Sequence, residues 1–299
     1  MQQQLFVNRQ RELDQLNAYL DKALSGAGQI SFVSGQAGTG KTALVRHFLE
    51  RALDAHPKLL AAIGICNAQT GIGDPYLPFR EALAMLTDAV AAERKLSPKN
   101  TGRVRTALVR SLQVLVEIAP ELIGALIPGG TVAGTLSKAV VSKSGWMDKL
   151  DELAKPSPQG NADVVAEESR IIEQYTAFVE ELTKDHPLIL FIDDLQWADA
   201  PSLNLLFHLG RHLEASRVLI LGAYRPETVS LGRQGERHPL EPIVNELTRY
   251  HGDITVDLDA LAEEANRAFV EALIDAEPNC LDRGFGQALY HQTGGHALF

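Results

Sequence analysis

Apolar residues along the chain alternate between short continuous runs and longer stretches with helical spacing. Five runs of strand length are rich in apolar residues, at residues 29–34, 59–66, 188–192, 218–223 and 254–258. Apolar positions recur every three or four residues, as in amphipathic helices, at residues 9–24, 42–53, 76–90, 167–183 and 202–213. Continuous apolar strands that alternate with helices are typical of a parallel sheet covered on both faces. The pattern therefore predicts an α/β fold with a five-stranded parallel sheet.

Residues 97–165 are the least regular part of the chain. Two helical patterns, at residues 104–118 and 135–153, are followed by a break rich in proline, glycine and serine at residues 155–163. Clusters of these residue types mark loops because they favour turns and end helices. We therefore predict a helical insertion around residues 97–165.

After Asp259 the strand pattern stops and only helical spacing follows, at residues 262–276 and 281–291. We predict an α/β domain over residues 1–259, followed over residues 260–299 by the start of a helical lid domain. The final residues show no capping pattern, and the last residue is apolar. We therefore expect the chain to come from a longer protein.

Residues 35–42, with the sequence GQAGTGKT, join the first apolar run to the helix that follows it. The pattern Gly-x-x-x-x-Gly-Lys-Thr between a strand and a helix is that of a P-loop. Glycine lets backbone N–H groups approach an anion, and a helix N-terminus adds unpaired donors and a partial positive charge. Lys41 suits the outer phosphates of a nucleotide, and the Thr42 hydroxyl suits Mg²⁺. The alternative is a glycine-rich turn that binds nothing, which the complete pattern in this context disfavours.

We expect the nucleotide phosphates to lie against the whole loop and the start of the next helix. The candidate nucleotide-binding residues here are Gly35, Gln36, Ala37, Gly38, Thr39, Gly40, Lys41, Thr42 and Ala43. Lys41 is also a candidate catalytic residue, because a cation beside the outer phosphates stabilises charge during phosphoryl transfer.

Two acids follow the third apolar run, in the segment LILFIDDLQWAD. Mg²⁺ prefers oxygen ligands in an octahedral shell, so Asp193 at the strand end is a candidate metal ligand together with Thr42. Asp194, one residue later, is a candidate to orient or deprotonate an attacking water. The alternative is that both acids form only a turn and a helix cap.

Arg225 ends the fourth apolar run, in the segment LGAYRPE. In open α/β sheets, ligands gather at the carboxyl ends of the strands. A guanidinium there suits the γ-phosphate of a nucleotide, and makes Arg225 a candidate catalytic and sensing residue. The alternative is a surface arginine paired with a nearby acid.

The composition is that of a globular protein without a globally basic surface. Hydrophobic residues make up 45%, charged residues 22%, and the formal net charge is −10. Cys66 and Cys280 are too few and too far apart for a disulfide framework or a metal site, which indicates a reducing compartment. The first residues are polar and charged, unlike a signal peptide, and no stretch is a clean membrane span. We expect a cytoplasmic protein with no membrane partner.

One local run of basic residues contains no acid. Its members are Arg94, Lys95, Lys99, Arg103, Arg105 and Arg110. Such a run is more often a solvated helix face than a binding patch. Direct nucleic-acid binding by this chain is therefore not expected.

With these residues placed, the chain resembles an AAA+ type P-loop ATPase of the STAND class, the signal-transducing ATPases with numerous domains. The likeness is to the ATPase module of large LuxR-type transcription regulators and of ATPases fused to adenylate cyclase domains. Five segments between Phe6 and Phe299 carry it: FVNRQREL, GQAGTGKT, FIDDLQWAD, AYRPE and TGGHALF. The P-loop alone identifies only the superfamily of P-loop proteins, whereas the combination of these segments is much more specific to the STAND class.

The resemblance implies a P-loop NTPase fold with strand order 5-1-4-3-2, and ATP or ADP with Mg²⁺ as cofactors. It implies that Val7 and Arg9 lie near the adenine. It also implies that Asp193 is the Walker B acid and that Arg225 is the sensor of the fourth strand. The expected activity is a slow, Mg²⁺-dependent hydrolysis of ATP.

The chain departs from the family pattern at three positions. Asn8 replaces the glycine of the usual V-G-R segment, and Ala297 stands where a G-x-P segment has proline against the base. Many relatives have glutamate where Asp194 stands, and aspartate is one methylene shorter.

Three functions are compatible with these residues. The first is a nucleotide-controlled signalling switch, in which ATP favours an open or homo-oligomeric state and slow hydrolysis resets it. Its effector and sensor domains would then lie beyond Phe299. The second is a DNA-handling initiator or clamp-loader-like ATPase that uses the basic residues between 94 and 110. The third is a scaffold that binds ATP without turnover.

Overall fold

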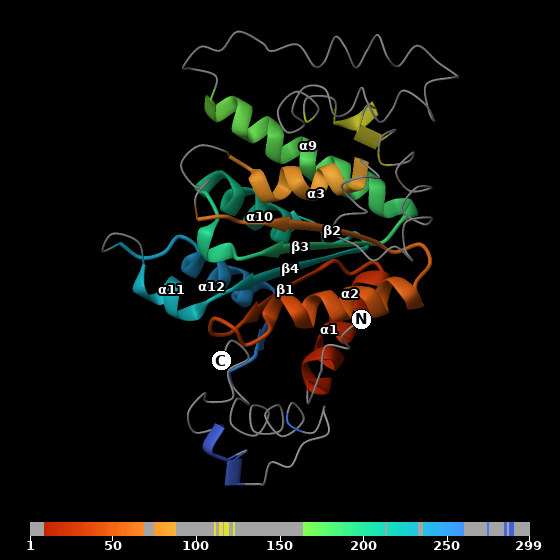
Figure 1. Cartoon of the computed structure of the whole chain (residues 1–299). Helices are drawn as coiled ribbons and strands as arrows, with labels where there is room; N and C mark the ends of the chain where they lie inside the picture. The colour runs from red at the N-terminus through yellow and green to blue at the C-terminus, as the bar shows by residue number, and fades with distance from the viewer. Residues whose placement is uncertain are drawn as a thin grey trace.

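The computed structural model describes residues 9–68, 75–87, 164–212, 214–232 and 236–259, with single residues between 111 and 122 and between 274 and 289 (Figure 1). Five parallel strands form one sheet in the order β2-β3-β4-β1-β5. The strands are β1 (Gln29–Ser34), β2 (Leu60–Ile65), β3 (Leu188–Asp193), β4 (Val218–Tyr224) and β5 (Thr255–Asp257). The helices are α1 (Gln10–Leu24), α2 (Lys41–Ala55), α3 (Leu77–Thr87), α9 (Val164–Asp185), α10 (Ala200–His212), α11 (Pro226–Leu231) and α12 (Leu240–His251), with a 3₁₀ turn, η2 (Leu195–Trp197).

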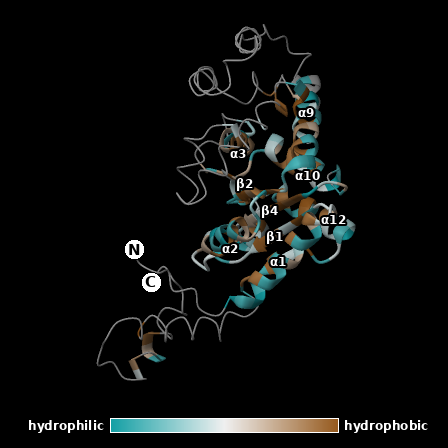
Figure 2. Cartoon of the chain, turned by 90° about the vertical axis from the view of Figure 1, so that its right-hand side faces the viewer, coloured by the Kyte–Doolittle hydropathy of each residue, from teal (hydrophilic) through white to brown (hydrophobic). Residues whose placement is uncertain are grey.

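Different helices cover the two faces of the sheet, because successive strand residues point to opposite sides. Phe32, Leu190 and Ile220 share one core with residues of α9, α10 and α12. Val33 and Phe191, each the next residue of its strand, share the other core with residues of α1 and α2. Figure 2 shows the hydrophobic residues gathered in the strands between these layers. The burial of both faces explains why the strands are apolar without alternation.

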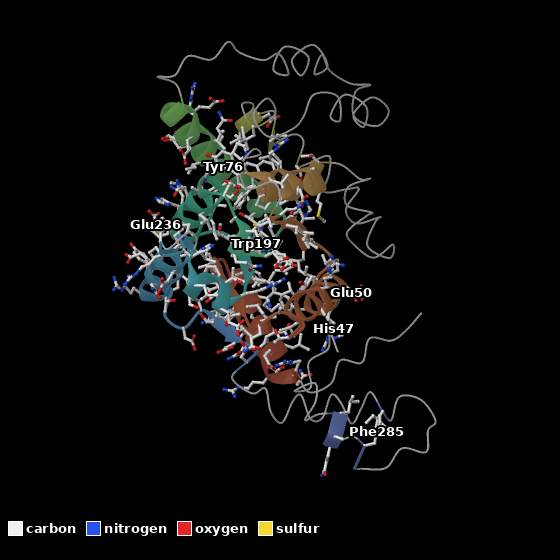
Figure 3. All side chains as sticks on the ribbon, turned by 60° about the vertical axis from the view of Figure 1, so that its left-hand side comes forward. His47, Glu50, Tyr76, Trp197, Glu236 and Phe285 are labelled. Atoms are coloured by element: carbon white, nitrogen blue, oxygen red, sulfur yellow. The ribbon has the colours of Figure 1, made fainter. Side chains whose placement is uncertain are left out.

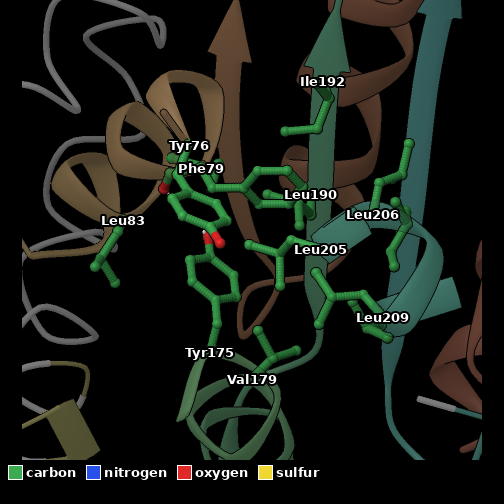
Figure 4. Packing of buried hydrophobic residues seen from close by; sticks show 14 of the residues in the cluster. Tyr76, Phe79, Leu83, Tyr175, Val179, Leu190, Ile192, Leu205, Leu206 and Leu209 are labelled. Carbon is green, nitrogen blue, oxygen red and sulfur yellow. Dashed lines mark hydrogen bonds between the residues drawn. The ribbon is translucent and has the colours of Figure 1, made fainter. Parts of the chain in front are cut away.

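Helix α9 is joined to α3 by aromatic packing on one face of the sheet (Figure 4). The Tyr175 ring meets Phe79 edge to face, with centroids 5.4 Å apart, and its hydroxyl donates to the Phe79 carbonyl at 3.3 Å. Tyr175 is fully enclosed in the core, and burial raises the pKa of its hydroxyl. Two helices far apart in the sequence are therefore held together against the sheet.

Strand β2 lies at the edge of the sheet, and α3 covers its open side. The Ile65 N–H donates to Glu81 Oε2 at 3.1 Å, and the Ile63 N–H donates to Met85 Sδ at 3.2 Å. An uncovered edge strand presents a row of N–H and C=O groups that can pair with another chain. Side chains of α3 use two of these donors, which protects the edge.

Gly64 allows α3 to approach β2 at this edge. A Cβ at Gly64 would lie 1.9 Å from the carbonyl oxygen of Pro78, which is backbone and cannot turn aside. Gly64→Ala is therefore expected to lower the free energy of unfolding by about 3 kcal/mol, because overpacking forces backbone shifts. Urea unfolding of the purified variant measures this loss.

Gly26→Ala is the matched control for Gly64→Ala. Gly26 has φ +94°, and a Cβ added there would have no other atom within 4 Å. Alanine at this position is therefore destabilised only by its left-handed backbone conformation. That conformation costs about 1–2 kcal/mol for a residue with a Cβ. Equal losses for the two variants would contradict the close approach of α3 to β2.

The predicted sheet and its strand order are confirmed. The observed order β2-β3-β4-β1-β5, written from β5 instead of from β2, is the predicted order 5-1-4-3-2. The predicted helices are present in the described ranges, with α9 starting earlier than expected, at Val164. Helices α11 and α12 were not predicted.

The described ranges contain no helix with both the length and the apolar character to cross a membrane. Most of the predicted insertion, the helical lid and the basic run lie outside the described residues.

Candidate functional site

The carboxyl ends of strands β1, β3 and β4 lie side by side in the sheet. β4 lies between β3 and β1, with Ile192 opposite Gly222 and Ser34 opposite Tyr224. The glycine-rich loop, the two acids and Arg225 follow the ends of these three strands. The sheet therefore brings together three segments that are far apart in the sequence. They meet at the carboxyl ends of the strands, where such sheets bind ligands.

Two glycines give the loop its shape. Gly38 has φ +81° and Gly40 has φ +87°, a left-handed conformation that other residues rarely adopt. Gly40 directly precedes α2, whose first residue is Lys41, and no side chain caps this helix end. Thr42 and Ala43 follow in the first helical turn. Unpaired N–H groups at a helix start favour an anion there.

The first part of the loop is packed against the end of β5. A Cβ at Gly35 would lie 2.7 Å from Thr39 Oγ1 and 3.2 Å from Leu258 Cβ, so a larger residue there would require these side chains to shift. The Gln36 N–H donates to both carboxylate oxygens of Asp259, at 3.2 and 3.1 Å. Ala37 lies in the turn that follows Gln36. The conformation of the loop is thus tied to the last described residues of the α/β domain.

Lys41 folds over the loop. Its Nζ donates to the carbonyl oxygens of Gly35 at 2.8 Å and Gln36 at 2.6 Å, and its side chain is buried. Burial lowers the pKa of the Lys41 ammonium, and the positive charge of Arg225 lowers it further, while nearby carboxylates oppose both. A phosphate group beside Lys41 would be favoured by both cations.

Thr42 and Asp193 bring two oxygen ligands together. The Thr42 hydroxyl donates to Asp193 Oδ2 at 2.7 Å. Burial raises the pKa of the Asp193 carboxyl, and the hydrogen bond from Thr42 opposes this shift. Hydroxyl and carboxylate oxygens suit Mg²⁺, which often takes one or two protein ligands and completes its shell with water and phosphate oxygens. The residues present therefore fit a magnesium ion bound together with a nucleotide.

Asp194 lies in the turn that follows β3. Its backbone has φ +56°, and its N–H donates to Asp193 Oδ1 at 2.9 Å. The next residue, Leu195, packs against β4 where Gly222 has no side chain, since a Cβ there would lie 2.5 Å from Leu195 Cδ1. Leu195 belongs to the core beneath this turn, and the partly buried Trp197 at the end of η2 packs against the same core (Figure 3).

Arg225, which follows β4, extends its side chain to Asp194. Its Nη2 lies 3.8 Å from Asp194 Oδ1, which is an ion pair beyond hydrogen-bond distance. Its Nε is buried and has no hydrogen-bond partner among the described residues. The side chain is 38% exposed, and its charge is close enough to lower the pKa of Lys41, so its terminal nitrogens can meet an anion beside that lysine.

Arg9 lies at the start of α1, close to the loop. Its Nη1 donates to Glu12 Oε1 at 3.0 Å and to the Leu258 carbonyl at 3.2 Å. Leu258 in turn borders Gly35. This places Arg9 at the border of the loop, whereas Val7 lies outside the described residues.

The sequence profile of the family described as AAA ATPase domain matches residues 5–221. The chain belongs to this family. The match includes the loop, Asp193 and Asp194, and it ends four residues before Arg225. It confirms the resemblance to AAA+ P-loop ATPases, and membership implies a nucleotide-binding domain. No curated protein sequence matches this AAA ATPase domain significantly.

Solved structures similar to this AAA ATPase domain include the Orc1 protein of Aeropyrum pernix in complex with DNA. That protein is 16% identical with a TM-score of 0.44, and the match covers 96% of this chain and 56% of the Orc1 chain. A Walker-type ATPase of Pyrococcus abyssi is 13% identical with a TM-score of 0.42, with 99% of this chain and 71% of that chain covered. The AAA ATPase domain described here thus spans little more than half the length of the Orc1 chain.

Two residues of this AAA ATPase domain contact the site without having been predicted from the sequence, and a third contacts one of these two. Asp259 accepts a hydrogen bond from the loop, and Gln196 contacts both Asp194 and Arg225. His238 contacts the carbonyl of Gln196. Gln196 is within the segment LQWAD and could have been considered, whereas no local pattern marks His238 or Asp259.

Proposed function

We propose that this AAA ATPase domain binds ATP with Mg²⁺, hydrolyses it slowly and acts as a STAND-type switch for an effector in a longer protein. One observation carries the proposal. The Thr42 hydroxyl lies 2.7 Å from Asp193, with Lys41 directly before Thr42 and Asp194 directly after Asp193. The groups that we propose to bind phosphate, bind the metal and activate water thus lie close together.

In this proposal the loop binds the phosphates of ATP. N–H groups of the loop and of the first turn of α2 surround them, and Lys41 moves from the loop carbonyls to the β- and γ-phosphates. Thr42 and Asp193 hold Mg²⁺, which neutralises phosphate charge when bound. Arg9 and Val7 lie beside the adenine.

Hydrolysis depends on Asp194 and Arg225. Asp194 orients the attacking water and accepts its proton, a role supported by its position beside the proposed metal ligand. Arg225 bonds the γ-phosphate, and its partial exposure and its charge close to Lys41 support this role. Charge on the transferred phosphoryl group is then stabilised by Lys41 and Arg225.

The switch depends on what changes when the γ-phosphate leaves. An arginine that bonds this phosphate loses its partner on hydrolysis, and such a difference can bias a two-state domain arrangement. The coupling is typically about 1–3 kcal/mol. We propose that it reaches residues 260–299 and, through them, a nucleotide-dependent oligomer or an effector.

Phosphate release from ATP by the purified chain tests the enzymatic part of the proposal. We expect release with Mg²⁺ and none with excess chelator, because Thr42 and Asp193 bind nucleotide phosphates through the ion. ATP binding without release would identify a scaffold. Steeply salt-dependent binding of duplex DNA would instead favour the DNA-handling function.

The switch is tested with a fluorescent pair, one dye at exposed Glu50 on α2 and the other within residues 262–276. The wild type is expected to show different distances with a non-hydrolysable ATP analogue and with ADP. Arg225→Ala should bind ADP normally and lose this difference, whereas Arg51→Ala, which changes an exposed arginine of α2, should keep it. A wild-type response in Arg225→Ala would exclude the sensor role.

A further inference from the structure

The side chain of Gln196 is fully buried in the turn between β3 and α10. Its Nε2 donates to Asp194 Oδ1 at 2.6 Å, and its Oε1 accepts a hydrogen bond from the Arg225 backbone N–H at 3.1 Å. One amide group thus bridges the turn after β3 and the end of β4. The two residues that it joins are the proposed water-activating acid and the proposed phosphate sensor.

The direction of the amide follows from its neighbours. A backbone N–H can only donate, so the group facing Arg225 is the amide oxygen. The amide nitrogen then faces the Asp194 carboxylate, which accepts. Donor and acceptor are both used, as a buried polar group requires.

The backbone of Gln196 is held as well. Its carbonyl accepts a hydrogen bond from His238 Nε2 at 2.9 Å, and His238 Nδ1 accepts one from the Leu240 N–H at 3.1 Å. Because Nδ1 accepts, the proton of a neutral His238 lies on Nε2. His238 is fully buried and directly precedes Pro239 and the start of α12. The bridge is therefore anchored to a third element, the segment that enters α12.

The bridge leaves one carboxylate oxygen of Asp194 available. Oδ1 accepts from Gln196 and is the oxygen nearest to Arg225. Oδ2 accepts no hydrogen bond from any residue in the described ranges, and the side chain is 33% exposed. A hydrogen bond to one oxygen restricts rotation of the carboxylate. The other oxygen can then meet a water.

We propose that Gln196 is a positioning residue for ATP hydrolysis, which holds the Asp194 carboxylate and the backbone of Arg225 in a fixed relation. This inference rests on the proposed function, in which Asp194 acts on the water and Arg225 on the γ-phosphate. The amide of Gln196 bonds these two residues, whereas Lys41 bonds the loop carbonyls and Thr42 bonds Asp193. The loss of Gln196 should therefore affect turnover more than nucleotide binding.

The test compares Gln196→Met with the wild type in ATP affinity by calorimetry and in kcat by phosphate release. Methionine keeps the length of the side chain and removes both hydrogen bonds. We expect kcat to fall on the order of tenfold to a hundredfold, because a loosely held base loses general-base help worth about 10²–10⁴ in rate. The Kd for ATP should stay within about twofold, because Lys41 and Thr42 are unchanged.

Ser202→Ala is the matched control. Ser202 is equally buried, and its Oγ donates to Asp199 Oδ2 at 2.6 Å rather than to Asp194 or Arg225. This variant should keep the wild-type kcat. If it lost as much turnover as Gln196→Met, the effect would be one of general destabilisation and the inference would be overturned.

A double-mutant cycle shows whether Gln196 acts through Asp194. In the Asp194→Asn background, Gln196→Met should cause a much smaller further loss of kcat, because the carboxylate that it positions is gone and only its bond to the Arg225 backbone is left to lose. Independent losses that multiply would overturn the inference. Gln196→Leu covers the case in which Gln196→Met does not fold, because leucine brings no charge, donor or acceptor into the buried turn and also removes both hydrogen bonds. It should be as slow as Gln196→Met, and a wild-type kcat would overturn the inference.

Two failures are distinguishable in these measurements. A wild-type chain that releases no phosphate would exclude the proposed ATPase function and this inference with it. A wild-type chain with normal turnover and an equally active Gln196→Met variant would leave the ATPase function intact and overturn only the role of Gln196.

Discussion

Lys41→Ala is expected to weaken ATP binding by on the order of 100-fold, about 3 kcal/mol, the upper range for a hydrogen bond to a charged group. The reason is the position of its ammonium group. Lys41 Nζ lies between two carbonyls of the loop, 2.8 Å from Gly35 O and 2.6 Å from Gln36 O. A polyphosphate that enters the loop gains this cation at close range, and calorimetry with ATP measures the loss.

Two variants separate this effect from damage to the loop. Lys41→Met keeps the aliphatic part of the side chain, so it should lose affinity as Lys41→Ala does. Lys58→Ala removes an exposed lysine just before β2, at the opposite end of that strand from the site, and should bind ATP as the wild type does. Unchanged ATP affinity in both Lys41 variants would refute the phosphate-binding assignment.

Asp194→Asn is expected to keep ATP binding and to lose turnover by about 10²–10⁴, the range of general-base assistance. The substitution keeps the shape of the side chain and the N–H bond to Asp193 Oδ1, which comes from the backbone. It removes the ability to accept a proton from water. Single-turnover phosphate release, with ATP affinity measured in parallel, gives both quantities.

Asp199→Asn is the control for this variant. Asp199 belongs to the same acidic segment, but its carboxylate accepts from the N–H and the hydroxyl of Ser202 at the start of α10. Asparagine can still accept there, so turnover should remain near the wild-type value. Wild-type turnover in Asp194→Asn would show that another group activates the water.

The part of the site that sequence predicted consists of groups beside strand ends. Gly35 to Thr42 follow β1, Asp193 ends β3, and Arg225 follows β4. In a parallel sheet these ends lie on one edge, so the meeting of the three segments could be expected before the structure. The roles of these residues stay predictions, as does the position of Val7.

The bridging contacts could not be predicted, because each depends on side-chain packing between elements. Gln196 looks like an ordinary polar residue in a turn, and its burial follows from Leu195 packing beside Gly222. His238 belongs to a segment for which no helix was predicted. Asp259 reaches the loop only because β5 pairs with β1, with Asp257 opposite Ser34.

The sequence by itself determined the α/β class, the strand order implied by the family resemblance, and the glycine-rich loop before α2. The class and the loop depend on local periodicity and on a contiguous motif, both of which are visible in one dimension, whereas the strand order followed only from the resemblance. Only the tertiary structure decided that α3 seals the edge of β2 and that the Gln196 amide joins Asp194 to Arg225. Such contacts join residues through the packed interior, where hydrogen-bond partners are set by distance and burial rather than by spacing along the chain.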